Sequence, residues 1–251
     1  MSKRVASYNQ GSQTSVAACA FCAPAEPCAP AEPRAPAEPC APAEPRTTVQ
    51  ASSSVQPIPV LVSACLTGEP CRYDCKPCDT PAIRALSRCP RVRLIPFCPE
   101  MDGGLDAPRH PCEIQGSAPT LDTWRSVQVA NCVGQDVTAS FQQGAQKALD
   151  LAKRYGVRLA ICKEKSPTCA STVIYDGTFS GRLIPGMGLT VAGLRSVGVG
   201  VISDQQLDAL LPEDVCPACA NPEGCVLGAL LSYDDAHLQV YTDTQSHVSA
   251  E

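Results

Sequence analysis

Four stretches of the chain are continuously apolar and rich in β-branched residues, and amphipathic stretches separate them. The apolar stretches lie at residues 58–66, 92–98, 157–163 and 197–203. Runs of this length and composition are typical of strands that are buried on both faces of a parallel sheet. Because strands that alternate with helices form right-handed βαβ units, the pattern predicts an α/β fold, a mostly parallel sheet flanked by helices in a Rossmann-like three-layer arrangement.

The clearest helical pattern lies within residues 136–156, where apolar side chains recur every three or four positions. Either Asp136 or Thr138 is suited to begin this helix, and Gly156 is suited to end it. Shorter helices are predicted at residues 80–88, 189–198 and 203–211. We place the α/β domain that these elements build at residues 58–204.

Two segments flank this domain and differ from it in composition. Residues 22–46 repeat a six-residue unit with proline at two fixed positions, and repeated proline without large apolar side chains leaves nothing to bury. We therefore interpret residues 1–57 as a disordered spacer. Residues 205–251 hold most of the last predicted helix and continue as an acidic, cysteine-containing appendage.

Charge is unevenly distributed along the chain. Residues 58–204 contain 16 Lys and Arg against 13 Asp and Glu, whereas residues 205–251 contain 8 acidic residues and no Lys or Arg. The mildly basic domain permits an RNA partner without requiring one. Aromatic residues make up only 4% of the chain, so a stacking platform for single-stranded nucleic acid is not indicated. No apolar run approaches the roughly 20 residues of a membrane span, so we expect no membrane partner, and nothing indicates an oligomeric state.

The cysteine content bears on the compartment. The chain contains 17 cysteines, an odd number, and its N-terminus lacks the apolar core of a secretory signal. These features favour a reducing compartment, and we expect a cytoplasmic protein. The serine-containing N-terminus, which has no acidic residue before Glu26, is also compatible with an organelle transit peptide.

Three cysteines stand where an α/β protein places its ligands, just beyond the carboxyl ends of strands. Cys65 ends the first apolar run, Cys98 ends the second, and Cys169 follows the third. Their separations of 33 and 71 residues do not match the paired spacing of a structural zinc site. Three thiolates suit an iron–sulfur cluster in which one iron has no protein ligand and can act as a Lewis acid toward a soft atom such as sulfur.

Further cysteines leave other functions open. They form two groups, Cys71, Cys75 and Cys78 in one loop and Cys216, Cys219 and Cys225 in the acidic tail. A Cys-x-x-Cys pair with a third thiol nearby is a signal for zinc or for redox chemistry. Zinc in the tail, a zinc- or nucleic-acid-binding module with structural thiols, and a thiol–disulfide oxidoreductase therefore remain alternatives.

Four blocks of the sequence closely resemble, in order, the blocks of the thiouracil desulfidase family, formerly a domain of unknown function. They are VSACLTGEPCRYDCK, IPFCPEMDGGLDAPRHPCEIQG, DVTASFQQGAQKALDLAK and SPTCASTVIYDGTFSGRLIPGMGLTVAGLRSVGVGVIS, and the resemblance covers about residues 58–204. The resemblance implies an enzyme with an oxygen-sensitive 4Fe-4S cluster, held by three cysteines, that removes sulfur from thiouracil-type bases without net redox change. Its substrate would be 2-thiouracil, 4-thiouracil, thiouridine, or thiouridine in transfer RNA.

Carried over position by position, the resemblance assigns five residues. Cys65, Cys98 and Cys169 would be the cluster ligands. Glu100 matches the acid/base carboxylate of the family, and Ser166 matches a serine that would donate a hydrogen bond to the ring or to the developing oxyanion.

Two positions depart from the family pattern. Cys75 and Ala170 stand where relatives usually have glycine. If the backbone at either position has a positive φ, the side chain strains its loop, and Ala170 directly follows Cys169. Cationic side chains also flank the proposed loops, either as solvated charges or as phosphate-binding groups: Arg72, Arg109, Lys163, Lys165 and Arg182.

Overall fold

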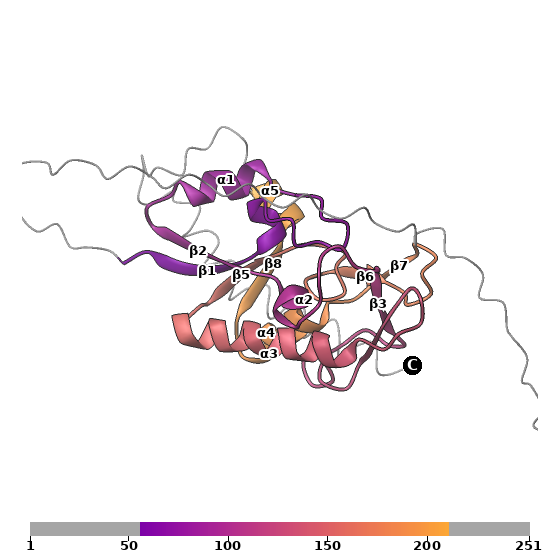
Figure 1. The fold of residues 1–251 in the computed structure, drawn as a ribbon. Helices are drawn as coiled ribbons and strands as arrows, with labels where there is room; N and C mark the ends of the chain where they lie inside the picture. Colours follow the sequence, from indigo (N-terminus) through magenta and orange to yellow (C-terminus); the bar gives the residue numbers. More distant parts are fainter. Residues whose placement is uncertain (1–55, 211–251) are drawn as a thin grey trace, which may run out of the picture.

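The structure, a computed structural model, describes residues 56–210 (Figure 1). The spacer predicted at residues 1–57 and the appendage predicted at 205–251 lie almost wholly outside this part of the chain. No helix among the described residues is long and apolar enough to cross a membrane.

A four-stranded parallel sheet forms the centre of the fold. Its strands are β1 (Ile58–Ser63), β2 (Val92–Phe97), β5 (Leu159–Cys162) and β8 (Gly200–Ser203), in the order β2-β1-β5-β8. Every strand falls within one of the four apolar runs, so the predicted fold class is confirmed. The first run differs in one respect: the strand ends at Ser63, and a 3₁₀ helix, η1 (Ala64–Thr67), continues it.

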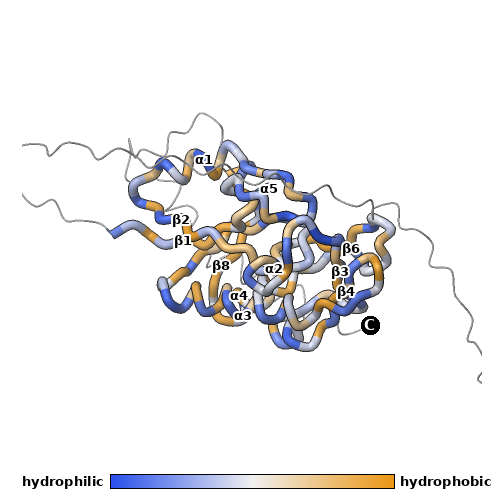
Figure 2. Tube along the Cα trace, viewed as in Figure 1, coloured by the Kyte–Doolittle hydropathy of each residue, from blue (hydrophilic) through white to orange (hydrophobic). Residues whose placement is uncertain are grey.

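Helices cover both faces of the sheet and give the three predicted layers. Helices α1 (Pro81–Ser87) and α5 (Asp204–Leu210) lie on one face, and α3 (Thr138–Tyr155) and α4 (Leu189–Ser196) lie on the other (Figure 1). Side chains of β1 alternate between the layers, because Val60 and Val62 pack in the core below α1 and α5 while Leu61 packs in the core with α3 and α4. Most residues of the four central strands are hydrophobic, and orange segments accordingly gather in the middle of the fold in Figure 2.

Local sequence sets the ends of the long helix. The carboxylate of Asp136 accepts a hydrogen bond from the backbone N–H of Thr138 at 2.8 Å, where α3 begins. Gly156 ends the helix in the left-handed conformation (φ 62°), which glycine adopts without a steric cost. Both predicted boundaries are confirmed. Leu207 of α5 is fully buried against the core, so the folded unit includes this helix.

Two small antiparallel hairpins were not predicted. They pair β3 (Cys112–Gln115) with β4 (Gln128–Asn131) and β6 (Val173–Tyr175) with β7 (Leu183–Pro185), to the right of the sheet in Figure 1. Strands of three or four residues are too short to show a periodic pattern. The hairpins are joined by Glu113, whose carboxylate accepts the N–H of Phe179 at 3.0 Å, and by Gln115, whose amide donates to the carbonyl of Gly177 at 3.2 Å.

A short helix, α2 (Pro99–Asp102), follows β2 and packs closely on α3. Two glycines permit this approach. A Cβ atom at Gly144 of α3 would overlap the Pro99 carbonyl, and one at Gly103 would overlap the Ser140 carbonyl. The backbone after β2 is therefore fixed directly against the backbone of α3. This contact also fixes the positions of Cys98 and Glu100, which lie in that segment.

Candidate functional site

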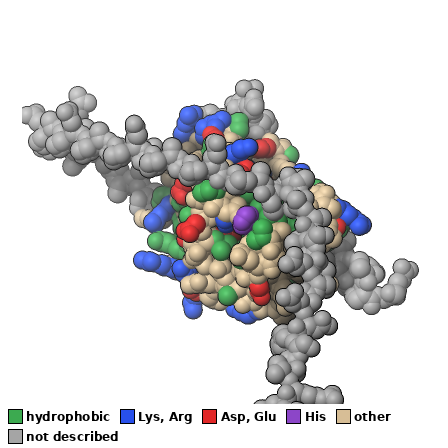
Figure 3. All heavy atoms as spheres, turned by 45° about the vertical axis from the view of Figure 1, so that its right-hand side comes forward, with side chains coloured by type: hydrophobic (Ala, Val, Ile, Leu, Met, Phe, Trp, Pro, Cys, Tyr) green, Lys and Arg blue, Asp and Glu red, His purple; other side chains and the backbone are tan. Residues whose placement is uncertain are grey.

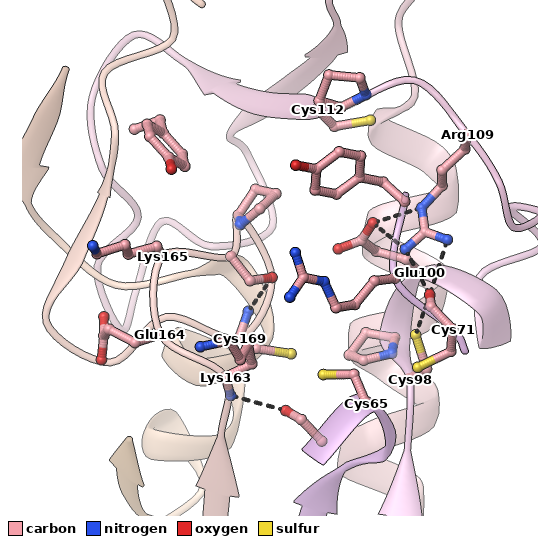
Figure 4. Close-up of a pocket in the computed structure, with 18 of the residues that line it drawn as sticks. Cys65, Cys71, Cys98, Glu100, Arg109, Cys112, Lys163, Glu164, Lys165 and Cys169 are labelled. Atoms are coloured by element: carbon pink, nitrogen blue, oxygen red, sulfur yellow. Dashed lines mark hydrogen bonds and ion pairs between the residues drawn. The ribbon is translucent and has the colours of Figure 1, made fainter. Parts of the chain in front are cut away.

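A cavity of about 340 Å³ opens beyond the carboxyl ends of β1, β2 and β5, beside the two hairpins. All five candidate residues line it: Cys65, Cys98, Glu100, Ser166 and Cys169. Figure 4 shows the sulfur atoms of Cys65 and Cys169 directed toward one another, with Cys71 and Cys98 beside each other across from them. The structure therefore brings together residues that lie as much as 104 positions apart in the chain.

The first two thiols follow strands that pair in register. Ile58 to Ser63 lie opposite Val92 to Phe97, so β1 and β2 end at the same edge of the sheet. Cys65 lies in η1 directly after β1, and Cys98 directly follows β2 as the residue before α2. The N–H of Cys98 donates to the carboxylate of Asp102 at 3.2 Å, which holds the start of this turn.

The third thiol lies in a loop between β5 and β6 that has no regular structure. The hydroxyl oxygen of Ser166 accepts the N–H groups of Thr168 and Cys169, both at 3.2 Å. The first N–H groups of α4 donate to the carbonyls of Pro167 and Thr168 at 2.9–3.3 Å. A Cβ atom at Gly188 would overlap the Thr168 carbonyl group, so glycine is required for this contact. The loop is thus fixed to the start of α4.

A buried carboxylate holds the far end of the same loop. Glu164 is 3% exposed, and its two oxygens accept the N–H groups of Ser171, Thr172 and Val173 and the hydroxyl of Ser171 at 3.0–3.4 Å. Four donors satisfy a carboxylate that would otherwise be costly to bury. The N–H of Glu164 itself donates to Asp204 at 2.8 Å, at the start of α5. No sequence pattern singled out this residue.

Glu100 is held on both of its oxygens. Arg109 donates to Oε2 from Nε at 2.8 Å, and its Nη2 lies 2.7 Å from the same oxygen, an ion pair in which both side chains are little exposed. The hydroxyl of Thr168 lies 3.1 Å from Oε1. Arg109 also donates to the carbonyl of Cys71 at 3.1 Å, so it is a paired and little-exposed charge rather than a solvated one.

A fourth thiol, Cys71, contacts two of the three candidate ligands. Hydrogen bonds with Cys65 and Cys98, together with the nearby Arg109 guanidinium, lower the pKa of Cys71. The same hydrogen bonds raise the pKa of Cys65 and Cys98, and the Cys169 sulfur raises both further. Burial raises the pKa of Cys169 to about 11. Cys71 and Cys169 thus both act on the pKa of Cys65 and Cys98, and Figure 4 shows the four side chains around the same part of the cavity.

Residues 60–206 match the family model described as 2-thiouracil desulfurase. The match covers more than half of the chain and includes every residue that lines the cavity. The chain belongs to the 2-thiouracil desulfurase family. The resemblance found in the four sequence blocks is thereby confirmed.

Two known proteins are similar to this chain. The uncharacterized protein YbbK of Bacillus subtilis (strain 168) is 39% identical over 152 residues, which are 61% of this chain and 99% of YbbK. The solved structure of the 4Fe-4S-dependent thiouracil desulfidase TudS is 41% identical, with a TM-score of 0.53, and the likeness covers 61% of this chain and 94% of TudS. The relatives thus correspond to the α/β domain.

The donor set at the cavity fits an iron–sulfur cluster of the kind on which TudS depends. Soft thiolates are the ligands that such clusters use, and cluster iron would stabilise the thiolate forms that burial and neighbouring thiols disfavour here. Within residues 56–210, no group of three His, Cys, Asp or Glu side chains is spaced for a single metal ion.

The structure also resolves the two departures from the family pattern. Cys75 has a φ of 55°, in the left-handed region where glycine is usual, so its side chain is accommodated at a cost. Ala170 is not among the residues with positive φ, and alanine therefore causes no backbone strain next to Cys169. Cys162, at the end of β5, is fully buried in the core.

The other cysteines and cations that the sequence analysis named do not all lie at the cavity. Cys78 lies against Cys65, and its N–H donates to the Cys65 carbonyl at 3.2 Å. Lys163 pairs with Asp204 at 2.6 Å. The tail cysteines and the zinc site suggested for them lie outside the described residues: Cys216, Cys219 and Cys225.

Proposed function

We propose that this protein is a 4Fe-4S-dependent desulfidase that converts the thiocarbonyl of a thiolated uracil into a carbonyl. The observation that carries the proposal is the convergence of three thiols and one carboxylate, from separate strand ends, on a single cavity. Family membership and the likeness to TudS support it. The overall reaction exchanges the sulfur of C=S for the oxygen of water and releases hydrogen sulfide, so no electrons are gained or lost.

Cys65, Cys98 and Cys169 would hold the cluster. Three protein ligands leave one iron of a cubane without a protein ligand, and the chemistry that it supplies when bound is that of a Lewis acid toward a soft sulfur atom. Cys71 lies in the same cavity but comes from the loop after η1, and we leave it outside the ligand set. Because Cys71 lies beside Cys65 and Cys98, a Cys71 variant tests whether the cluster has these three ligands and no fourth.

Glu100 is suited to act as the general base. Its carboxylate lines the cavity, lies two residues after Cys98, and is fixed through Arg109 and Thr168. A positioned carboxylate can take a proton from the water that adds to the carbon of the thiocarbonyl, and it can return that proton to the departing sulfur. Positioned acid–base groups of this kind typically contribute 10²–10⁴-fold to a rate.

The cavity fits a free base or a nucleoside better than transfer RNA. Its volume of about 340 Å³ is at the small end of pockets that hold small molecules. Three cations near it are already paired with carboxylates: Arg72 with Asp74, Arg109 with Glu100, and Lys163 with Asp204. On the face in Figure 3, most basic side chains lie near the outline and are interspersed with acidic ones. We therefore propose a small thiolated base as substrate.

Anaerobic cluster reconstitution of the full chain tests the proposal. The loaded protein is incubated with 2-thiouracil, 4-thiouracil and 4-thiouridine, and loss of the thiocarbonyl absorbance is followed together with sulfide release. We expect both signals for the wild type, and neither signal nor a brown cluster absorbance for Cys169→Ser. Cys112→Ser is the matched control, because Cys112 lines the same cavity from β3 and is not a proposed ligand.

Two other outcomes contradict parts of the proposal. A cluster that assembles without consuming any thiolated base would show that the substrate class is wrong. If the wild type assembles no cluster, Cys65, Cys98 and Cys169 are not cluster ligands and the proposed function is wrong.

A further inference from the structure

Thr168 lies between the two residues that the family resemblance assigned to chemistry. Its side chain is 1% exposed, and its hydroxyl oxygen is 2.9 Å from Ser166 Oγ, 3.1 Å from Glu100 Oε1 and 3.5 Å from Cys169 Sγ. Thr168 and Glu100 are 68 positions apart in the chain. No sequence motif marked this residue, and its three contacts require an explanation.

The hydrogen bonds around Ser166 fix the direction of the first contact. A serine hydroxyl has one proton to donate and two lone pairs that accept. Both lone pairs of Ser166 are engaged, because its oxygen accepts the N–H groups of Thr168 and Cys169. The remaining contact, to the Thr168 hydroxyl, must therefore use the Ser166 proton. Ser166 donates and Thr168 accepts.

The same reasoning fixes the second contact. With its oxygen accepting from Ser166, the Thr168 hydroxyl has its own proton to donate. Glu100 Oε1 and Cys169 Sγ are the acceptors in reach, and the carboxylate oxygen is both closer and the stronger acceptor. A directed chain of hydrogen bonds thus runs from Ser166 through Thr168 to Glu100.

We propose that Thr168 is a positioning residue for Glu100, an inference that rests on the proposed function. Arg109 holds the carboxylate only at Oε2, and a group held at one oxygen can still pivot about that contact. The Thr168 hydroxyl supplies the second fixed point. Because Thr168 directly precedes Cys169, the hydrogen bond sets the carboxylate relative to the loop that carries the third thiol. Ser166, in turn, orients Thr168.

Thr168→Val tests this role, since valine has nearly the same shape and lacks the hydroxyl. We expect kcat to fall roughly 10- to 100-fold, the range that corresponds to losing a hydrogen bond to a charged group, with a much smaller change in KM. Thr168→Ser should restore most of the lost kcat. Thr190→Val is the matched control, because Thr190 is equally buried and its hydroxyl has no hydrogen-bond partner among the described residues.

All rates are compared per assembled cluster, so that a loading defect is not mistaken for a catalytic one. Should Thr168→Val fail to fold, the comparison of Thr168→Ala with Thr168→Ser carries the same test. Equal kcat values for Thr168→Val and wild type, or equal losses for the serine and valine variants, would overturn the proposal.

A crystal structure of Thr168→Val gives a result that does not depend on activity. We expect the carboxylate of Glu100 to keep Arg109 on Oε2 and to rotate away from its wild-type position at Oε1. An unmoved carboxylate would overturn the positioning role even if the protein desulfurises thiolated bases. Conversely, a rotated carboxylate in a protein that consumes no thiolated base would retain the positioning role and reject the proposed function.

Discussion

Two of the candidate ligands reach the cavity on segments that are held in different ways. The segment after β2, which carries Cys98, is fixed by strand register and by backbone contacts between α2 and α3 at Gly103 and Gly144. The loop after β5, which carries Cys169, has a backbone contact at Gly188 but is held in addition by polar side chains, above all Glu164 and Ser166. Added volume should therefore disturb the first segment, whereas lost side-chain hydrogen bonds should disturb mainly the second.

The largest expected effect comes from Glu164→Gln. An amide cannot accept from all four donors that surround the carboxylate, and buried donors are left unsatisfied. We expect the free energy of unfolding to fall by about 3 kcal/mol, measured by urea denaturation. Asp102→Asn is the matched change on the other segment. Asp102 is half-buried and accepts one N–H, from Cys98, so its loss should be about 1 kcal/mol or less.

Cluster loading should follow the same order. Glu164→Gln loosens the loop that presents Cys169, whereas Asp102→Asn leaves the packing of α2 on α3 in place. Equal losses of stability in Glu164→Gln and Asp102→Asn would show that the two segments depend equally on side-chain hydrogen bonds.

Gly144→Ala should have the next largest effect. The added Cβ overlaps the Pro99 carbonyl, which is backbone and cannot move aside without displacing Cys98. We expect the free energy of unfolding to fall by roughly 1–3 kcal/mol, as for other overpacked sites.

Gly193→Ala is the control for this change. Gly193 also lies in a helix, but its added Cβ would meet the flexible end of the Leu149 side chain at 3.1 Å. The better helix propensity of alanine, worth up to about 1 kcal/mol, offsets that contact. If the Gly144→Ala protein is as stable as the wild type, the backbone contact with α3 is not what fixes the segment that carries Cys98.

The smallest effect is expected for Cys71→Ser, because this thiol belongs to neither segment. Cys71 contacts Cys65 and Cys98, yet we place it outside the ligand set. The serine variant should assemble a full cluster, measured as iron and acid-labile sulfide per chain, whereas Cys98→Ser should not. Loss of the cluster in Cys71→Ser would mean that the ligand set includes a residue from the loop after η1.

The sequence alone determined the framework of this protein. Apolar runs and helical periodicity depend on neighbouring residues, so they located the four parallel strands and the two ends of α3, which begins at Thr138 and stops before Gly156. Parallel strands end at one edge, and this rule was enough to expect Cys65, Cys98 and Cys169 at a common crevice. Four ordered sequence blocks identified the family.

Only the tertiary structure decided how that crevice is built. The contact of Thr168 with Glu100 joins residues 68 positions apart, and the burial of Glu164 depends on donors that gather around it only when the loop folds. The left-handed backbone at Cys75, and its absence at Ala170, likewise depend on the path of each loop. Local patterns carry no information on such pairings, because the free energy that selects them comes from packing between distant segments.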